Sequence, residues 1–303
     1  MKNENNIKWG IDLGGTKIEA VILDAQANNK ILFRERVPTL SDQGYKKVLS
    51  QIEFLVNLMK EKSQLSPTEI GMGTPGRLDP ASQTLKNSNS VCLNDQPVLK
   101  DLENLLQVKV KIENDANCFA LSEAVYLLNN GYEDGEVILG IILGTGVGGG
   151  IVAHGKLISG RHGLGGEWGH NFLDESGGEC YCGKIGCVEK IIAGPSLEQY
   201  YYALSSENLK LKDIVEKSRA ESNENITLTM DRLFYFFGKA MAQVINILDP
   251  TIVVIGGGVG NIDELYTHGT KHIKKYLFNN ELHTQFLKPK FGDSSGVLGA
   301  ALL

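Results

Sequence analysis

The stretch Ile7-Lys-Trp-Gly-Ile-Asp-Leu-Gly-Gly-Thr-Lys-Ile-Glu-Ala-Val-Ile-Leu23 decides how this chain begins to fold. Residues 7–13 are apolar enough for a buried strand, Gly14-Gly15 interrupts them, and residues 17–23 alternate like a second strand. Glycine has no Cβ, so backbone N–H groups in such a turn can approach an anion closely. A tight turn without a ligand is the simpler interpretation of any one such turn, and a phosphate-binding turn is the other.

This first turn differs from two better-known nucleotide loops. A Rossmann fingerprint needs a helix directly after its glycines, whereas residues 17–23 have the alternation of a strand. A Walker A loop needs Gly-Lys followed by Ser or Thr, whereas the order here is Gly15-Thr-Lys17. What remains is a phosphate site built from turns between β-strands.

Two further glycine turns follow apolar strands later in the chain. Leu143-Gly-Thr-Gly146 opens a glycine run that ends at Gly150, and Gly256-Gly-Gly258 follows the apolar segment 251–255. Three such turns, each after an apolar strand, are far more specific than one. Residues 11–16 also echo residues 142–146, but glycine turns between strands are common, and an internal duplication stays open.

Hydrophobic periodicity predicts an α/β chain in which helices follow the early strands. Strands are expected at 7–13, 17–23, 31–37, 70–73, 108–113, 137–143, 149–153 and 251–255. Helices are expected at 41–62, 116–128, 189–203, 208–221 and 229–248, with a final one at 262–277. Residues 159–187, which are rich in glycine and hold three cysteines, are expected to form an ordered loop region.

Composition limits the classes of function. With 42% hydrophobic and 22% charged residues, the 303-residue chain has the balance of an ordinary globular protein. A formal net charge of -6 argues against general affinity for nucleic acid or an anionic membrane. The segment Met1 to Lys8 is polar, without a signal-peptide core, and no apolar run approaches the roughly 18 residues of a membrane span. We therefore expect a cytoplasmic protein, in which the five cysteines form no disulfide framework.

A polar cluster, Glu113-Asn-Asp-Ala-Asn117, stands where a predicted strand ends and a predicted helix begins. Asp115 has two interpretations there. Asp is a preferred N-cap residue, which is a purely structural role. A helix N-terminus also favours an ionised carboxylate, which could accept a proton during group transfer to a hydroxyl. The two roles are compatible, and the sequence leaves both open.

A histidine and three cysteines have the spacing of a metal site, His170-x9-Cys180-x-Cys182-x4-Cys187. Three thiols and one imidazole complete a tetrahedral zinc site with no position left for water, which indicates a structural ion. The alternative is three free thiols in a loop. Cys180 and Cys182 are too close in sequence for an easy disulfide, so we favour zinc.

The three glycine turns together resemble those of the actin-like ATPase and sugar-kinase superfamily. Asp12-Leu-Gly-Gly-Thr-Lys17 is similar to its first phosphate loop, Leu143-Gly-Thr-Gly146 to its second, and Gly256-Gly-Gly258 to its adenosine loop. The resemblance implies a two-lobed, ribonuclease H-like α/β fold with ATP and sugar in the cleft between the lobes.

The run from His170 through Cys187 to Glu189 resembles the defining motif of the ROK family (repressors, open reading frames, kinases). The resemblance extends from Asp12 to the turn Gly292-Asp-Ser-Ser-Gly296. It implies transfer of the γ-phosphoryl group of ATP to a sugar, with Asp115 as catalytic base.

The same resemblance implies the remaining site residues. Sugar contacts are expected from Asn87, Asn89, Asn114, Asp115, Glu167, His170 and Glu189. ATP contacts are expected from Asp12, Gly14, Gly15, Thr16, Lys17, Gly144, Thr145, Gly146, Gly256, Gly257 and Gly258, with Mg²⁺ near Asp12. Structural Zn²⁺ is expected on His170, Cys180, Cys182 and Cys187, with the second ring nitrogen of His170 turned toward the sugar. Asn87 and Asn89 have a simpler alternative role, since loop asparagines often support their own turns.

Three classes of protein share parts of this pattern. A ROK repressor would need an N-terminal helix-turn-helix segment, whereas only eleven residues precede Asp12 and none forms a basic helix. An actin-like ATPase without a small acceptor would not need Glu167, His170 and Glu189 or the zinc motif. A sugar kinase accounts for every motif.

The identity of the sugar depends on resemblance alone. Three segments, 86–90, 93–97 and 166–171, resemble bacterial ROK fructokinases (mannofructokinases) more than N-acetylglucosamine kinases. We therefore expect a fructokinase that phosphorylates O6 of fructose, with mannose as a secondary substrate. An N-acetylhexosamine or glucose is the alternative.

Two expectations concern organisation. The smaller lobe is expected to comprise residues 1–116 and about 290–303, and the larger lobe residues 117–289. A homodimer is implied by the resemblance only.

Overall fold

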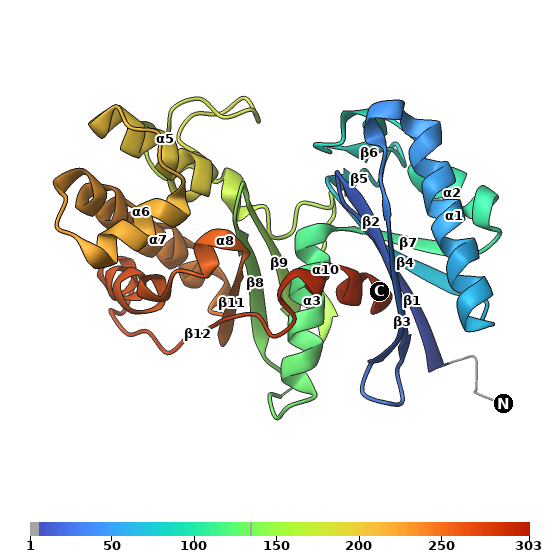
Figure 1. Ribbon diagram of the computed structural model, residues 1–303. Helices are drawn as coiled ribbons and strands as arrows, with labels where there is room; N and C mark the ends of the chain where they lie inside the picture. The colour runs from blue at the N-terminus through green and yellow to red at the C-terminus, as the bar shows by residue number, and fades with distance from the viewer. Residues whose placement is uncertain (1–5, 134) are drawn as a thin grey trace. The chain divides into compact units, whose positions relative to one another are not determined.

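The computed structural model describes residues 6–133 and 135–303, and the chain divides into two compact units (Figure 1). Unit 1 comprises Met1–Asp134, Gly150–Gly165 and Lys290–Leu303, and unit 2 comprises Gly135–Gly149 and Gly166–Pro289. The expected α/β class is confirmed. The sequence showed no signal-peptide core in the segment Met1 to Lys8. Residues 1–5 of that segment lie outside the described residues.

Unit 1 is built on a five-stranded sheet with the order β3-β2-β1-β4-β7. Its central strand β1 pairs antiparallel with β2 and parallel with β4, which in turn pairs parallel with β7. The strands are β1 (Ile7–Leu13), β2 (Lys17–Asp24), β3 (Lys30–Pro38), β4 (Glu69–Thr74) and β7 (Lys109–Asn114); two short strands, β5 (Arg77–Leu78) and β6 (Leu85–Lys86), pair separately.

Helices cover both faces of the unit 1 sheet (Figure 1). One face carries α1 (Tyr45–Ser63) and α2 (Val98–Leu106), and the other carries α3 (Asp115–Leu128) and α10 (Ser295–Ala301). Because side chains alternate along a strand, β1 serves both faces. Trp9, Ile11 and Leu13 are buried in one core with α1, whereas a Cβ at Gly10 would meet the backbone of α10. Asp12 follows the same alternation toward α10.

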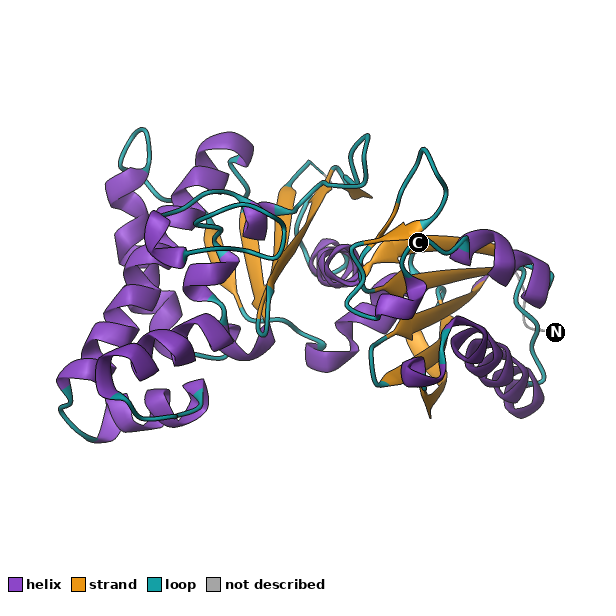
Figure 2. Cartoon of the chain, turned by 90° about the horizontal axis from the view of Figure 1, so that it is seen from above, coloured by secondary structure: helices purple, strands orange, loops and turns teal. Residues whose placement is uncertain are grey.

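Unit 2 is built around a second five-stranded sheet, in the order β10-β9-β8-β11-β12. The strands of this sheet are β8 (Val137–Leu143), β9 (Val147–Ala153), β10 (Lys156–Leu157), β11 (Ile252–Gly256) and β12 (Gln285–Leu287), of which β10 and the later part of β9 belong to unit 1 and the others to unit 2. Its helices are α4 (Glu189–Ile192), α5 (Gly194–Ser205), α6 (Leu211–Ala220), α7 (Glu224–Leu248), α8 (Gly257–Gly260) and α9 (Thr270–Ile273). Figure 2 shows the helices α5 to α7 gathered on one side of these strands.

The two sheets share one topology. Each places its first strand in the middle, with the next two strands on one side and the two later strands on the other. β1, β4 and β7 run parallel, as do β8, β11 and β12. The weak sequence echo between residues 11–16 and 142–146 therefore falls on equivalent strand–turn units, which supports an internal duplication.

Several predicted elements differ in the structure. The helix expected at 189–203 is two helices, because the chain is extended at Ala193 before Gly194-Pro195 starts α5. The segment expected as a final helix at 262–277 is irregular: it contains a π-helix, Leu265–Gly269, the single turn α9 and a 3₁₀ turn, Lys274–Tyr276. The last helix of the chain is α10, which begins at the end of the turn named at residues 292–296 and was not predicted.

The boundary between the lobes also differs from the prediction of residue 116. Helix α3 belongs to unit 1, where it packs on α10. Its buried Glu123 accepts hydrogen bonds from Lys290 N (2.8 Å) and Ser295 Oγ (2.7 Å). These bonds connect α3 to the C-terminal segment. These buried contacts keep residues 117–128 with the first sheet rather than with the second.

Among the described residues, no helix has the length and apolar character needed to cross a membrane. The cytoplasmic location and the homodimer stay predictions of the sequence. All five cysteines lie in the described part of the chain, and none of them forms a disulfide there.

Candidate active site and metal centre

The backbone carbonyl groups of the first glycine turn accept hydrogen bonds from other segments of the protein. Thr39 donates from Oγ1 to Gly14 O (2.7 Å) and from its backbone N–H to Thr16 O (3.0 Å). Ser41 Oγ donates to Gly15 O (3.2 Å). Thr16 itself is exposed, so the turn presents a solvent-accessible backbone edge that suits an anion.

Asp12 stands at the end of β1 in a confined space. A Cβ at Gly296 would lie 3.1 Å from its Oδ2, and a Cβ at Gly73 would lie 3.5 Å from its Oδ1. Burial, together with the negative charges of Asp115 and Glu19, raises the pKa of Asp12 to about 6, against the opposing effect of Lys17. A carboxyl group crowded by like charges is a favourable place for a cation.

Asn114, rather than Asp115, caps helix α3. The Asn114 side chain accepts from Asn117 N at 2.6 Å, and its backbone is extended as an N-cap requires. Asp115 is the first helical residue, where its Oδ1 accepts from Ala116 N at 2.8 Å. Desolvation by the surrounding protein raises the pKa of Asp115, and the bond from Ala116 opposes that rise. The capping role therefore belongs to Asn114, and the Asp115 side chain is not needed for it.

Asn87 and Asn89 lie in a loop that Asn94 holds together. Asn94 accepts from Ser88 N (2.8 Å) and donates to Ser88 O (2.9 Å). Ser88 is buried, whereas Asn87 and Asn89 on either side of it are exposed. The two hydrogen bonds between Asn94 and Ser88 therefore fix the backbone that carries Asn87 and Asn89.

The second glycine turn, with the start of β9, is closely packed by other parts of unit 2. Gly144 N donates to Gly146 O (3.0 Å) within the turn, and Gly194 N donates to Gly144 O (2.9 Å). A Cβ at Gly146 would lie 2.6 Å from Glu189 Oε2, and a Cβ at Gly149 would lie 2.8 Å from the Trp168 ring. Two of the glycines in this run thus make room for protein side chains, which the sequence analysis did not foresee.

The third glycine turn forms the start of α8. Gly257 has φ +83°, and a Cβ there would overlap the backbone of Leu143. Tyr266 of the π-helix donates its hydroxyl to Gly260 O at 2.8 Å, which fixes the other end of α8. The turn is thus held against β8, next to the second glycine turn.

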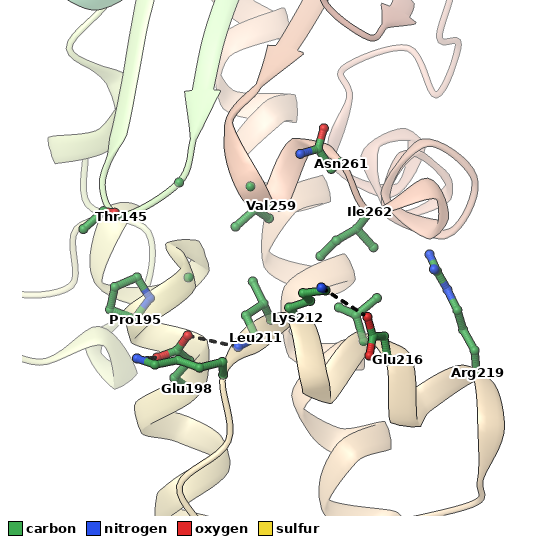
Figure 3. Close-up of a pocket in the computed structure, with 15 residues that line it drawn as sticks. Thr145, Pro195, Glu198, Leu211, Lys212, Glu216, Arg219, Val259, Asn261 and Ile262 are labelled. Carbon is green, nitrogen blue, oxygen red and sulfur yellow. Dashed lines mark hydrogen bonds and ion pairs between the residues drawn. The ribbon is translucent and has the colours of Figure 1, made fainter. Parts of the chain in front are cut away.

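A cavity of about 810 Å³ in unit 2 lies beside the second and third glycine turns (Figure 3). Gly144, Thr145, Gly258 and Val259 line one side of it, and α5 and α6 line the other. The lining residues of those two helices and of the connections at their ends include Pro195, Glu198, Lys210, Leu211, Lys212 and Arg219. Apolar walls with a few charged groups at the rim suit a nucleoside.

The four predicted metal ligands come together in unit 2. Their ligand atoms all lie within 4.8 Å of one another. His170 Nδ1 lies 3.6 Å from Cys180 Sγ, and Cys182 Sγ lies 3.6 Å from Cys187 Sγ. A tetrahedral ion with Zn–S bonds of about 2.3 Å separates two sulfur ligands by about 3.8 Å, so the spacing and the donor set fit zinc.

The residues around this cluster bear on the predicted sugar contacts. His170 Nε2 lies 3.0 Å from the hydroxyl of Tyr181, on the ring edge opposite the thiols. Glu189 Oε2 accepts from Val147 N at 2.9 Å, so one carboxylate oxygen already serves β9. Glu167 precedes the 3₁₀ turn Trp168–His170 and is partly buried.

Comparison with known proteins agrees with these features. Residues 8–303 match the ROK family. This chain belongs to the ROK family. Within that family, the N-acetyl-D-glucosamine kinase of Vibrio parahaemolyticus is 37% identical, covering 97% of this chain and 98% of that protein. The N-acetyl-D-glucosamine kinase of Pasteurella multocida is 34% identical, covering 98% and 99% respectively.

Two solved ROK structures are similar over nearly their whole length. The ROK hexokinase from Thermus thermophilus is 30% identical with a TM-score of 0.85, covering 98% of this chain and 97% of that one. A ROK family glucokinase from Streptomyces griseus, in complex with glucose and AMPPNP, is 27% identical with a TM-score of 0.76. The similarity covers 97% of this chain and 98% of the glucokinase chain.

The ROK motif residues are divided between the units. Unit 1 holds Asp12, the first glycine turn, Asn87, Asn89, Asn114 and Asp115. Unit 2 holds the second and third glycine turns, Glu167, Glu189 and the four metal ligands. In unit 2 the second and third glycine turns lie side by side, since a Cβ at Gly144 would be 3.9 Å from Gly258 N, and both turns line the cavity.

Sequence reasoning missed several residues that shape this ROK site. Thr39, Asn94 and Tyr266 each make two hydrogen bonds to backbone groups of these turns and loops or of the strands beside them, and no local pattern marks them. Tyr181 stands between two metal ligands, and that position could have drawn attention to it. Charged residues of α6 line the cavity, whereas the sequence predicted a helix there and no role in binding.

Proposed function

We propose that this protein transfers the γ-phosphoryl group of ATP to the terminal hydroxyl, O6, of N-acetyl-D-glucosamine. The observation that carries the substrate is the end-to-end similarity to N-acetyl-D-glucosamine kinases, at 34–37% identity. The segments that resembled fructokinases are three short loops, whereas this similarity extends along the chain. N-acetyl-D-glucosamine therefore replaces fructose as the principal candidate.

Asp115 is the proposed general base. Its carboxylate accepts the proton of the sugar hydroxyl as that oxygen forms a bond to the γ-phosphorus. The bond from the γ-phosphorus to the oxygen that bridges it to the β-phosphate breaks, and ADP leaves with that electron pair. The raised pKa of Asp115 supports this role, because a base works best when its pKa approaches the working pH.

Asp12 is the proposed partner of Mg²⁺. Magnesium usually binds through one or two carboxylates, water and substrate phosphates, and a crowded carboxylate next to a glycine turn fits that pattern. When bound, the ion would neutralise charge on the phosphates. The backbone of Gly14 to Lys17 would hold the same phosphates from the other side.

The nucleotide is proposed to use the two turns of unit 2 as well. Gly144, Thr145 and Gly146 would contact phosphate, and Gly256, Gly257 and Gly258 would lie against the ribose. The 810 Å³ cavity supports this assignment, since its volume and its lining suit adenosine. Lys210 and Arg219, which line the cavity, are paired with Glu198 (3.0 Å) and Glu264 (2.7 Å), so the support comes from the shape and the apolar lining rather than from free positive charge.

Amide and carboxylate side chains are proposed to bind the sugar. Asn87, Asn89 and Asn114 would supply amides, and Glu167 and Glu189 would supply carboxylates. Hydrogen-bonding residues of this kind suit a polyol, and His170 adds a ring nitrogen. Zn²⁺ on His170, Cys180, Cys182 and Cys187 would fix the angle of that ring.

A coupled assay of ADP release across sugars tests the proposal. We expect N-acetyl-D-glucosamine to give the highest kcat/KM, ahead of fructose, mannose, glucose and N-acetylmannosamine. If fructose is turned over equally well or better, the protein is a fructokinase instead. Absence of sugar-dependent ADP release with every sugar would overturn the kinase itself.

A further inference from the structure

The first residues of β9, Val147 to Gly149, are held from two directions by segments that flank the metal cluster. These residues directly follow the second glycine turn, so whatever fixes them also fixes that turn. Both holding segments lie in unit 2.

One hold comes from the segment that ends in His170. The indole Nε1 of Trp168 donates to Gly148 O at 3.0 Å, and its ring packs where a Cβ at Gly149 would otherwise lie. The next residue, Gly169, lies directly against the Val147 carbonyl, where a Cβ would overlap it. Trp168 and Gly169 are both buried, so this contact is part of the interior.

The other hold comes from the segment that begins at Cys187. Glu189 Oε2 accepts from Val147 N at 2.9 Å and fills the space beside Gly146. The Glu189 backbone carbonyl accepts in turn from Ser196 Oγ at 2.9 Å. Helix α4 is thereby fixed to α5, whose first residue Gly194 donates to Gly144 O at 2.9 Å.

The two holding segments meet at the metal cluster. His170 is two residues from Trp168, and Cys187 is two residues from Glu189. Val188 N donates to Asn171 O at 3.0 Å, and Phe172 pairs with Cys187 in an antiparallel bridge. A metal that binds both His170 and Cys187 would join the segments at the point from which each reaches β9.

We propose that Trp168 and Glu189 are positioning residues for the second glycine turn, and that the metal cluster acts through them on nucleotide binding. The cluster then serves ATP as well as the sugar. This rests on the proposed function, in which that turn contacts phosphate. A cluster that only oriented His170 toward the sugar would leave nucleotide affinity unchanged when the metal is removed.

The chain offers a matched pair of substitutions for the test, because it has two tryptophans. Trp168→Phe keeps a ring but removes the N–H that Gly148 accepts. Trp9→Phe removes an indole N–H that has no hydrogen-bond partner among the described residues and lies in unit 1. Affinity for AMPPNP with Mg²⁺, in the absence of sugar, is measured for both by titration calorimetry.

Loss of one buried hydrogen bond predicts about five-fold weaker AMPPNP binding in Trp168→Phe, with Trp9→Phe within two-fold of the wild type. An AMPPNP Kd for Trp168→Phe within two-fold of the wild type overturns the inference while the proposed function stands. Wild-type protein that binds no AMPPNP overturns the proposed function and the inference with it.

Metal removal supplies the second arm. In the Trp9→Phe protein, Trp168 is the only tryptophan, so its fluorescence reports directly on the β9 contact. We expect chelation of the metal, or Cys182→Ser, to change that fluorescence and to weaken AMPPNP binding at least five-fold. Cys182 is exposed, which makes its replacement the mildest in the cluster. Metal-free protein that stays folded and binds AMPPNP with unchanged Kd overturns the link between the cluster and the nucleotide.

Discussion

The imidazole Nε2 of His170 lies 3.0 Å from the hydroxyl of Tyr181. The other ring nitrogen, Nδ1, faces Cys180 Sγ at 3.6 Å. The ring nitrogen proposed for the sugar is therefore already in contact with a side chain of the same loop. Tyr181 is 78% exposed, so its ring has room to move aside.

Replacement of Tyr181 by Phe should tighten sugar binding. The sugar must displace the Tyr181 hydroxyl from His170, and that exchange costs about 0.5–1 kcal/mol, or roughly two- to five-fold in Kd. We expect kcat to change little. Calorimetric titration of N-acetyl-D-glucosamine measures the effect; weaker binding by the variant would instead make Tyr181 a sugar contact.

Replacement of Asp115 by Asn should remove the proton acceptor while preserving the shape of the site. We expect kcat to fall by about 10²–10⁴, with sugar Kd nearly unchanged. Asn114 caps α3, so the helix should remain intact. Asp231→Asn, at an exposed position of α7, is the control and should leave kcat unaltered. Near-normal turnover by Asp115→Asn would remove it as the base.

Replacement of Asn94 by Ala should release the loop that carries Asn87 and Asn89. Two hydrogen bonds to Ser88 are lost, worth about 2 kcal/mol together, and we expect the KM for sugar to rise about ten-fold. The KM for ATP should stay within two-fold. Asn104→Ala, on the exposed side of α2, serves as the control. An unchanged sugar KM would show that the two loop amides do not contact sugar.

Replacement of Asp12 by Asn should stabilise the nucleotide-free, metal-free protein at neutral pH. The pKa of Asp12 rises from 3.8 to about 6 on folding, so the folded state disfavours its ionisation. The resulting destabilisation is absent below about pH 4, grows through pH 6 and is then about 3 kcal/mol. Asn carries no charge at any pH, so the variant escapes this effect.

Urea unfolding of Asp12→Asn and wild type at pH 4, 5, 6 and 7.5 tests this prediction. The gain in stability should be near zero at pH 4 and reach a plateau above pH 6, while activity is lost at every pH. A difference that does not depend on pH would contradict the assignment of the shift to Asp12. Higher stability together with lost activity would indicate that Asp12 is present for cation binding rather than for stability.

The sequence predicted the parts of the fold that depend on neighbouring residues. Period-two alternation identified the strands on both sides of Gly14-Gly15, because side chains on a strand alternate between its two faces. It missed α10, whose seven residues are small and lack a helical stripe. It placed the lobe boundary at residue 116, since nothing near α3 reveals that Glu123 binds Lys290 and Ser295.

The sequence by itself determined which residues are the candidates, namely the four predicted metal ligands, the glycine turns and Asp115, because each belongs to a short pattern along the chain. Only the tertiary structure decided that Asn114 takes the cap, that Tyr181 faces His170, and that Gly146 and Gly149 leave room for Glu189 and Trp168. The hydrogen bond from Val147 to Glu189 beside these glycines joins residues 42 apart in the chain. Packing of whole elements brings such residues together, and no local pattern records it.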